Sequence, residues 1–503
     1  MKKLKLVCVA IAMAGAAPTF AGGLLTNTNQ HVAFNRMMSR EASIGIDGVY
    51  YNPAGVVFMG EGHHLAINWQ LAYQTRTINN DYKLFTNNVN NPITPRDFKG
   101  KAFAPVIPSF QYAYNKGKWS FQANFSLTGG GGKCTFDDGL GSFEKIVSET
   151  AIAACGLAGV VDQTLGNTLG QQGMEMFTSD QAFGKTGKYS FNSYMHGRQY
   201  YYGLSAGAAY KFCDNFSAFL GVRGVYALTN YYGYVENINV GNMPLYKVLD
   251  PTKENAANIE LSCDQTGVGF TPIIGVDYKT GRWNFSAKYE FKTRIRLKNK
   301  SVNQTPSIGN LPANLANQMT GILTARYQQA GLPLEQAKQQ AENTTNTVLS
   351  DPKVGATMMG LKTQFDQKLN KAIGEYEDGK KIAGDIPGYL ALGIGYSPVD
   401  AVRVNVGFHW FDDKNATSYN NRNKELKRGT LEYNAGVEVD VNKKITLSTG
   451  WQNTNYGLSD EYMDDKSFVV SSNSAAIGGV YHINKKMDLN VAYFHTFYQH
   501  KKT

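Results

Sequence analysis

Charged residues alternate along residues 283–297, and this pattern is the first place where the sequence could do chemistry. The charged side chains at every second position are Lys288, Glu290, Lys292, Arg294 and Arg296. In an extended strand, residues two positions apart share one face. Such a face can hold the carboxylate of a ligand, or it can pair with acidic side chains of neighbouring segments. We favour the pairing.

Catalytic and metal-binding motifs are weak by comparison. The sequence contains no CxxC pair and no HExxH motif, and no Ser/His or paired-carboxylate spacing rises above chance. The adjacent residues His63 and His64 fit the solvated start of a strand better than a pair of metal ligands. We therefore expect no enzyme, no metal site and no cofactor.

Strict alternation of apolar and polar residues predicts the elements that position these charges. From Val402 to Trp410, Val, Phe and Trp side chains alternate with Arg, Asn, Gly and His. Residues 119–127 and 431–441 repeat the pattern. Alternation over this length indicates β-strands with one apolar and one polar face.

The connections between the strands are unequal, which distinguishes a membrane barrel from a soluble sandwich. Short turns fall at residues 115–117, 213–215, 279–281, 398–400, 442–443 and 484–486. They alternate with connections that are mostly longer, as in outer-membrane barrels, whose short turns lie in the periplasm. A mean hydropathy of −0.34 argues against a bundle of spanning helices. In a barrel, the alternating charged side chains of residues 283–297 form a column that faces the lumen. Arg223 and Arg403 are expected to face the lumen as well.

The N-terminus and the distribution of charge are consistent with export. Three lysines precede an apolar run, so residues 1–21 are predicted to be a signal peptide. The formal charge of +10 is spread along the chain rather than clustered with aromatic residues, which excludes nucleic acid as a partner. Cys134 and Cys155 fall in one long connection and could pair after export, which the sequence leaves open.

Two connections, residues 129–188 and 301–381, are far longer than ordinary loops, and both read as helical. In the second, helices are predicted near 311–330 and 334–349, and we interpret this polar region as a surface cap. In the first, apolar residues recur at near-helical spacing. These candidate ligand-capture residues are Phe143, Ile146, Val147, Ile152, Leu157, Val160 and Val161. Their face could equally pack against its own loop or the barrel rim.

The segment before the first strand, residues 22–59, lacks the alternation of the barrel and ends in a turn motif. The motif consists of Asn52, Pro53, Ala54 and Gly55. Such a segment can hang in the periplasm or fold into the lumen. Through residues 27–55, which include this motif, the sequence resembles the FadL/TodX-type outer-membrane transporters of long-chain fatty acids and other hydrophobic compounds.

The resemblance implies a domain plan and a mechanism. Residues 22–59 would be a hatch that plugs an all-β, 14-stranded barrel formed by residues 60–503, with Asn52, Pro53 and Ala54 as the hatch signature. A ligand would bind an apolar site on the outer loops, move inward as the hatch rearranges, and leave sideways at the third strand. The glycines at 129–132 could supply flexibility there, although we favour them as the start of a loop.

The expected protein is a monomer of the bacterial outer membrane that contacts lipid, lipopolysaccharide and a hydrophobic small molecule. One alternative is a general diffusion porin for small polar solutes, against which the plug-like N-terminus argues. A less favoured alternative is an outer-membrane lipase or protease. The sequence does not identify the substrate, so fatty acids, aromatic hydrocarbons and other lipid-soluble compounds stay open.

The strand count raises a further question. Alternation gives thirteen strands, starting near residues 65, 104, 118, 189, 215, 257, 282, 386, 401, 429, 444, 468 and 487. Bacterial single-chain barrels have an even number of strands. We therefore expect either a closing strand beyond Thr503 or a strand missed near Ala104 or Ile386. Pairing of residues 487–499 with the first strand would refute the former.

Overall fold

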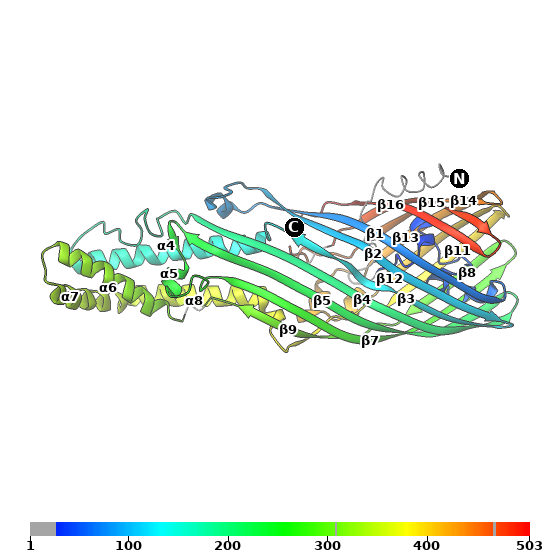
Figure 1. The fold of residues 1–503 in the computed structure, drawn as a ribbon, viewed down its shortest axis with the longest axis horizontal. Helices are drawn as coiled ribbons and strands as arrows, with labels where there is room; N and C mark the ends of the chain where they lie inside the picture. The colour runs from blue at the N-terminus through cyan, green and yellow to red at the C-terminus, as the bar shows by residue number, and fades with distance from the viewer. Residues whose placement is uncertain (1–26, 307–308, 466–468, 503) are drawn as a thin grey trace.

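The chain forms an elongated antiparallel β-barrel, and several long helices lie beyond one end of its strands (Figure 1). The computed structural model describes residues 27–306, 309–465 and 469–502. The predicted signal peptide, residues 1–21, lies outside the described residues. The order and pairing of the strands confirm the predicted barrel fold.

The barrel wall consists of strands that follow one another in hydrogen-bonded order. These are β1 (Gly62–Asn80), β2 (Arg96–Lys116), β3 (Trp119–Phe136), β4 (Tyr189–Cys213), β5 (Phe216–Val240), β7 (Ile259–Thr280), β8 (Trp283–Glu290), β11 (Tyr389–Val399), β12 (Val402–Phe411), β13 (Leu431–Asn442), β14 (Ile445–Asn455), β15 (Ser472–Asn484) and β16 (Met487–Tyr498). Short strands complete the wall: β6 (Met243–Pro244) pairs with β5, and β9 (Arg296–Gln304) pairs with β7 and with β10 (Lys381–Ala383).

Alternation along the strands sorts side chains between lipid and lumen. On β1, Leu65, Ile67 and Trp69 point outward and are 58%, 77% and 68% exposed. On β3, polar side chains such as Gln122 and Asn124 point inward and are buried. A lipid-facing wall requires this arrangement, because only every second residue of each strand meets the hydrocarbon.

The six predicted short turns are confirmed. They join the hairpins β2–β3, β4–β5, β7–β8, β11–β12, β13–β14 and β15–β16. All six lie at the end of the barrel opposite the long helices (Figure 1). By the usual orientation of such barrels, this is the periplasmic end.

The thirteen predicted strands are present and form the path of the wall. The short strands β6, β9 and β10 were not predicted, and β10 lies close to Ile386, but it pairs with β9 and adds no strand to that path. Ala104 lies inside β2, which begins at Arg96 rather than near residue 104, and Ile386 lies between β10 and β11. Within the described residues, β16 pairs with β15 and β1 pairs with β2, without a ladder between β1 and β16. The closing strand beyond Thr503 therefore stays a prediction.

Helices from the long connections form a cap beyond the outer ends of the strands (Figure 1). They are α4 (Gly141–Leu169), α5 (Tyr246–Leu249), α6 (Leu311–Gln329), α7 (Leu334–Leu349) and α8 (Pro352–Ile373). The helical predictions for both connections are confirmed, but α8 was not predicted. Its start signal is present, because Asp351 accepts a hydrogen bond from the Lys353 N–H at 2.8 Å and Pro352 occupies the first turn.

The cap has its own apolar core. Val147 and Val161 of α4 pack in one cluster with Met319 and Leu323 of α6, and all four are at most 2% exposed. Within the described residues, α4 is the one helix long and apolar enough to cross a membrane by length and composition. It instead packs against α7, α8 and the outer ends of β4 and β5.

The four cysteines within the described residues are free. Cys134 lies on β3 and Cys155 lies on α4, where its thiol donates to the Phe183 carbonyl at 3.3 Å. The disulfide that the sequence left open between Cys134 and Cys155 is therefore not formed.

Candidate functional site

The segment before β1 folds into the barrel lumen, and we call its described part, residues 27–58, the hatch. It contains α2 (Val32–Met37), α3 (Gly48–Tyr51) and a short 3₁₀ turn, η1 (Gly55–Phe58). Most of its side chains are buried. Figure 1 shows the hatch in dark blue among the strands. Polar groups on the inner wall satisfy its backbone, as irregular structure at membrane depth requires.

Arginines of the hatch are paired in the interior. Arg40 binds Asp47 through two hydrogen bonds, Nε to Oδ2 at 2.7 Å and Nη2 to Oδ1 at 3.0 Å. Arg36 reaches the wall, where it contacts Glu438 of β13 and donates to Ser448 Oγ of β14 at 2.9 Å. Arginine suits such pairs because its planar fork matches a carboxylate.

A histidine links the hatch to the wall. His409 of β12 lies between Glu41 of the hatch, at 2.7 Å from Nε2, and Glu432 of β13, at 2.8 Å from Nδ1. All three side chains are at most 1% exposed. Two N–H donors of an imidazolium can satisfy both carboxylates at once. The hatch is thus held by charge-assisted contacts.

The Asn-Pro-Ala-Gly motif anchors the end of the hatch to three wall strands. The contacts are Asn52 Nδ2 to Asp277 Oδ2 of β7 (2.5 Å), Gln122 Nε2 of β3 to Pro53 O (2.7 Å) and Ser217 Oγ of β5 to Ala54 O (2.7 Å). Within the motif, the Gly55 N–H donates to Asn52 Oδ1 at 3.1 Å. The turn predicted from the sequence therefore also binds the hatch to the wall.

Glycines on the inner wall make room for the hatch. A Cβ at Gly436 of β13 or at Gly450 of β14 would lie 2.1 Å from the Met37 carbonyl oxygen. A Cβ at Gly393 of β11 would lie 2.6 Å from Glu41 Cβ. Any side chain at these positions would displace the hatch. Alternation places these glycines on the inner face, but no local signal in the sequence identifies their role.

The charged column predicted along residues 283–297 is split by the break between β8 and β9. Lys288 and Glu290 on β8 are buried in the lumen. Lys288 Nζ donates to the Tyr50 carbonyl of the hatch at 2.7 Å and to Glu290 Oε1 at 2.9 Å. Arg223 of β5 binds the same carboxylate through two hydrogen bonds of 2.6 and 2.9 Å. These charges make ion pairs, the alternative that we favoured.

Beyond Glu290, the prediction of an inward-facing column is wrong. Thr293 and Ile295 are buried, whereas Arg294 and Arg296 are exposed on the other face. The interruption of the strand shifts the alternation by one residue. Lys292 is partly exposed, with its Nζ 4.0 Å from Asp385 Oδ2, and Arg296 Nη1 lies 2.8 Å from Asp385 Oδ1.

A polar cavity of about 720 Å³ lies between the hatch and the wall formed by β12–β16. From the hatch, its lining includes Arg36 and Asp47, and from the wall it includes Arg403, Glu438 and His482. Arg403, another predicted lumen charge, donates to Glu438 at 2.7 Å and forms a two-pronged pair with Asp440. The cavity leaves space beside the hatch within the barrel.

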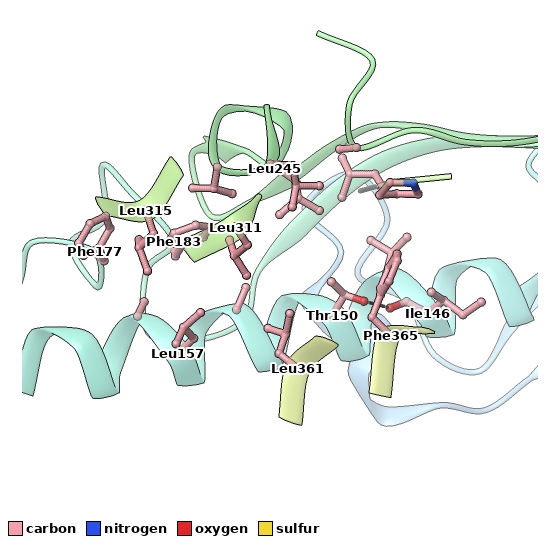
Figure 2. Close-up of a pocket in the computed structure, with 18 of the residues that line it drawn as sticks. Ile146, Thr150, Leu157, Phe177, Phe183, Leu245, Leu311, Leu315, Leu361 and Phe365 are labelled. Atoms are coloured by element: carbon pink, nitrogen blue, oxygen red, sulfur yellow. Dashed lines mark hydrogen bonds between the residues drawn. The ribbon is translucent and has the colours of Figure 1, made fainter. Parts of the chain in front are cut away.

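A second cavity, of about 60 Å³, lies in the cap and is apolar (Figure 2). Its twenty lining residues come from α4, α5, α6 and α8, from the outer ends of β5 and β7, and from the connections around them. Thr150 is the one lining residue with a polar side chain, and its hydroxyl donates to the Ile146 carbonyl at 2.7 Å. No charged side chain of the described chain lines it.

The predicted capture residues divide between this cavity and the cap core. Those that line the cavity are Ile146, Val147, Leu157 and Val161. Phe143 and Val160 are partly buried against the core. Ile152 is 42% exposed, and its Cδ1 lies beside the backbone of Gly187 rather than in the cavity. The face therefore packs within its own cap, which was one of the two alternatives, and encloses a small cavity there.

A gap interrupts the wall between β2 and β3. The two strands pair from Gly100↔Phe136 to Phe103↔Lys133 and again from Phe110↔Phe125 onward, but not between these stretches. In the gap, β2 carries Pro105 and Pro108, which lack the N–H that a ladder needs. Across from them lies a run of glycines in β3.

The glycine run belongs to β3, so its assignment as the start of a loop is wrong. Gly130 and Gly131 have φ values of 68° and 128°, which disfavour any other residue. The register with β4 shifts between Leu127 and Gly129 and again between Gly130 and Gly132. Prolines on one strand and glycines on the other thus keep the ladder from forming at this height.

The N-terminal end of the hatch covers the lumen side of the gap. The Asn27 N–H donates to the Thr128 carbonyl at 3.0 Å, and Gln30 Nε2 donates to the Leu127 carbonyl at 2.7 Å. Gln111 of β2 in turn donates to the Gln30 carbonyl at 3.0 Å. The hatch therefore takes the place of the missing strand partner.

No family model matches the sequence, and no curated protein matches it either. Among solved structures, a FadL homologue from Pseudomonas aeruginosa is 13% identical, with 95% of this chain and 92% of that chain covered and a TM-score of 0.55. The toluene transporter TodX of Pseudomonas putida is 12% identical over 96% of this chain and 94% of that chain, with a TM-score of 0.46.

The toluene transporter TbuX of Ralstonia pickettii is 13% identical over 89% of this chain and 87% of that chain, with a TM-score of 0.45. Of these three structures, the one from Pseudomonas aeruginosa has a TM-score above 0.5 and therefore shows the fold. The fold is that of a FadL-type barrel, as the hatch motif predicted.

Proposed function

We propose that this protein takes up hydrophobic compounds across the bacterial outer membrane. The cavity in the cap carries this proposal, because an apolar site beyond the outer ends of the strands can bind a compound that water expels. The hatch supports this proposal too. It occupies the lumen, so the barrel has no open pore through which a compound captured outside could simply diffuse. The FadL-type fold is consistent with this function.

The lining of the cap cavity narrows the substrate class. A site that orients a carboxylate needs a cation or several hydrogen-bond donors, and the described lining offers neither. The cavity is also far smaller than the several hundred cubic ångströms of an ordinary ligand site. We infer that α4, α6 and α8 separate around an aliphatic chain or an aromatic ring.

The polar cavity beside the hatch supports a hatch that moves. It lets α2 shift toward β12–β16 inside the barrel without opening the wall. Such a shift must break the contacts of Arg36 and Glu41 with the wall. The hatch therefore acts as a gate between the cap and the gap in the wall.

Lateral release through the gap between β2 and β3 completes the proposed route. The gap lies in the lipid-facing wall, and the N-terminal end of the hatch covers it from inside. A hatch that withdraws Asn27 and Gln30 uncovers it. A hydrophobic compound then enters the bilayer, where it is soluble, rather than the aqueous periplasm.

The capture step can be tested with two substitutions on the same helix. Leu157→Asn places an amide in the cavity, whereas Ile152→Asn places the same group on the exposed side of α4 and serves as the matched control. We expect Leu157→Asn to lower the uptake of a radiolabelled hydrophobic compound by about ten-fold, because it buries an unpaired polar group against the ligand. Ile152→Asn should leave uptake within about two-fold of the wild type.

A third variant keeps this test decisive if Leu157→Asn disrupts the cap. Ala158→Met fills part of the cavity with an apolar, flexible side chain and should lower uptake without adding a polar group. Heat-modifiable migration on gels verifies that each barrel is folded. Normal uptake by both Leu157→Asn and Ala158→Met would refute the capture hypothesis.

The substrate class is tested with ligands that share a chain and differ in the headgroup. Binding of dodecanol and dodecanoate to the purified protein should agree within about three-fold, because the lining holds no cation. A strong preference for dodecanoate would show that the carboxylate is recognised, which contradicts the inferred class.

Lateral release is tested by a disulfide across the gap. Continuing the register beyond Phe110↔Phe125 places Ser109 opposite Ser126, so Ser109→Cys/Ser126→Cys should close part of the gap when oxidised. Tyr112→Cys/Ala123→Cys, a pair within the intact ladder, is the control. We expect oxidation to stop uptake in the first variant and reduction to restore it. Uptake that ignores the gap disulfide would exclude this route.

A diffusion porin remains the alternative function, and single-channel recording separates the two. With the hatch in the lumen, we expect no steady ion conductance in planar bilayers. Large, stable conductance in the wild-type protein would favour the porin.

A further inference from the structure

The outer surface of β2–β4 carries a cluster of basic side chains near the outer ends of the strands. Lys133 of β3 and Arg198 of β4 stand directly opposite each other in the register. Lys101 of β2 and His196 of β4 both pair with Thr135, so each lies diagonal to Lys133. We call Lys101, Lys133, His196 and Arg198 the basic cluster.

The height of the cluster follows from the aromatic residues on the same strand. Near the periplasmic turn, Tyr210 of β4 packs on Trp119, with ring centroids 4.7 Å apart. Towards the outer side, Tyr200 and Tyr202 stack with their centroids 5.8 Å apart. Such aromatic girdles mark the two interfaces of a membrane barrel. The basic cluster lies directly beyond the outer girdle.

The rise of the strand gives the same height. From Tyr210 to Arg198, β4 climbs ~40 Å at about 3.3 Å per residue. With a tilt of about 45°, this becomes ~28 Å along the membrane normal, slightly more than the apolar band of ~25 Å. Arg198 and Lys133 therefore lie level with the headgroups of the outer leaflet.

The cluster lacks internal compensation for its charge. Like charges directly opposite each other on two strands are destabilising. In the described part of the chain, no ion pair includes Lys101, Lys133 or Arg198, and Arg198 Nε is buried without a hydrogen-bond acceptor. Asp264, an acidic residue on the same outer face, accepts from Asn230 of β5, which separates it from Arg198.

A second pair of like charges lies farther along the same outer face. Lys298 of β9 stands opposite Lys381 of β10, and both side chains are exposed. Two such pairs near the outer ends of the strands indicate that the surroundings, rather than the protein, supply the anions.

We propose that the basic cluster binds the phosphate groups of the anionic glycolipid in the outer leaflet. Lys133 and Arg198 form the centre of the site, because a phosphate between them accepts charge-assisted hydrogen bonds from both. Lys101 and His196 lie on either side, and the acyl chains run down over Tyr200 and Tyr202. This site depends on where the barrel sits in the membrane and is independent of the compound that the protein is proposed to transport.

The test measures binding of lipid A to the purified barrel by native mass spectrometry. Lys133→Gln/Arg198→Gln removes two charges from the site. Lys485→Gln/Lys486→Gln removes two charges from the β15–β16 turn at the opposite end and is the matched control. We expect the first variant to bind lipid A at least about ten-fold more weakly than the wild type, and the control to bind within about two-fold.

Two further ligands identify the group that is bound. Dephosphorylated lipid A should bind the wild type as weakly as lipid A binds the Lys133→Gln/Arg198→Gln variant, which supports recognition of phosphate. Inorganic phosphate alone should bind weakly, because it lacks the acyl chains. Unchanged lipid A binding by the double variant, equal binding of the dephosphorylated lipid, or tight binding of free phosphate would each overturn the proposal.

Discussion

The hatch and the cap are parts of the same chain, but different kinds of interaction hold them in place. The hatch is fixed by buried ion pairs and hydrogen bonds such as Arg40–Asp47 and Glu41–His409. The cap is held by apolar packing between α4, α6, α7 and α8. Polar networks have one satisfied geometry, whereas apolar contacts are non-directional. The cap can therefore open by degrees, while the hatch must release several contacts together.

Breaking one hatch pair tests this difference most strongly. Arg40→Met leaves the Asp47 carboxylate buried without its partner and should destabilise the seated hatch by about 3–5 kcal/mol. Hydrogen exchange of residues 31–52 measures the effect, and Arg40→Lys, which keeps the charge but loses the fork, should fall in between. Unchanged exchange in Arg40→Met would mean that the pair does not hold the hatch.

A cavity made in the cap core should have a smaller and local effect. Leu323 of α6 is fully buried, and Leu323→Ala should destabilise the cap by about 2–4 kcal/mol through lost packing. Exchange should rise in α4 and α6 but not in the hatch. The exposed Ile322→Ala, on the same helix, is the control and should change little. Faster exchange of the hatch in Leu323→Ala would show that the two regions are coupled.

Asp413 contrasts with the paired carboxylates of the hatch, because its side chain is buried and no ion pair joins it to a basic side chain among the described residues. It lies in the 3₁₀ turn η4 (Asp413–Asn415), outside the strands, and its Oδ2 accepts from the Thr430 N–H at 2.7 Å. Burial raises its pKa from 3.8 to about 6, and Oδ1 has no hydrogen-bond partner. The fold therefore favours the protonated carboxyl. The stability that protonation confers is complete below about pH 3.8 and is lost as the pH rises through 6.

Replacing this carboxylate should consequently stabilise the loop at neutral pH. We expect Asp413→Asn to slow the exchange of residues 413–430 at pH 7.5 by an amount equivalent to about 2–3 kcal/mol. At pH 4 the difference should nearly vanish, because Asp413 is then mostly protonated. An equal effect at both pH values would mean that lost hydrogen bonds, rather than ionisation, set the difference.

Much of the barrel was predictable because its signal is local. Alternation identified all thirteen strands of the path, and the turn residues identified the periplasmic end. The same logic failed at Arg294 and Arg296, since the break after Glu290 shifts the phase of the strand without a clear mark in the sequence. Local alternation can predict a face only as far as the strand stays continuous.

The candidate site was less predictable, because it depends on contacts between distant segments. The Asn52–Gly55 motif was recognisable as a turn, but its bonds to β3, β5 and β7 were not. Gly436 and Gly450 carry meaning only once Met37 is known to lie against them. The gap between β2 and β3 needs the prolines of one strand beside the glycines of the other. Such pairings follow from the register between neighbouring strands, which cannot be read from a single sequence.

The length of β4 and β5 has a consequence for the cell surface. Each strand has 25 residues, well beyond the roughly 9–11 needed to cross the hydrocarbon. From Arg198 to the start of β4 at Tyr189, the wall continues for ~30 Å along the strand. The cap is thus carried out through the sugars that surround the barrel. An antibody or a protease outside intact cells would meet the helices α6 and α7, which lie farthest from the barrel (Figure 1), before the strands of the wall.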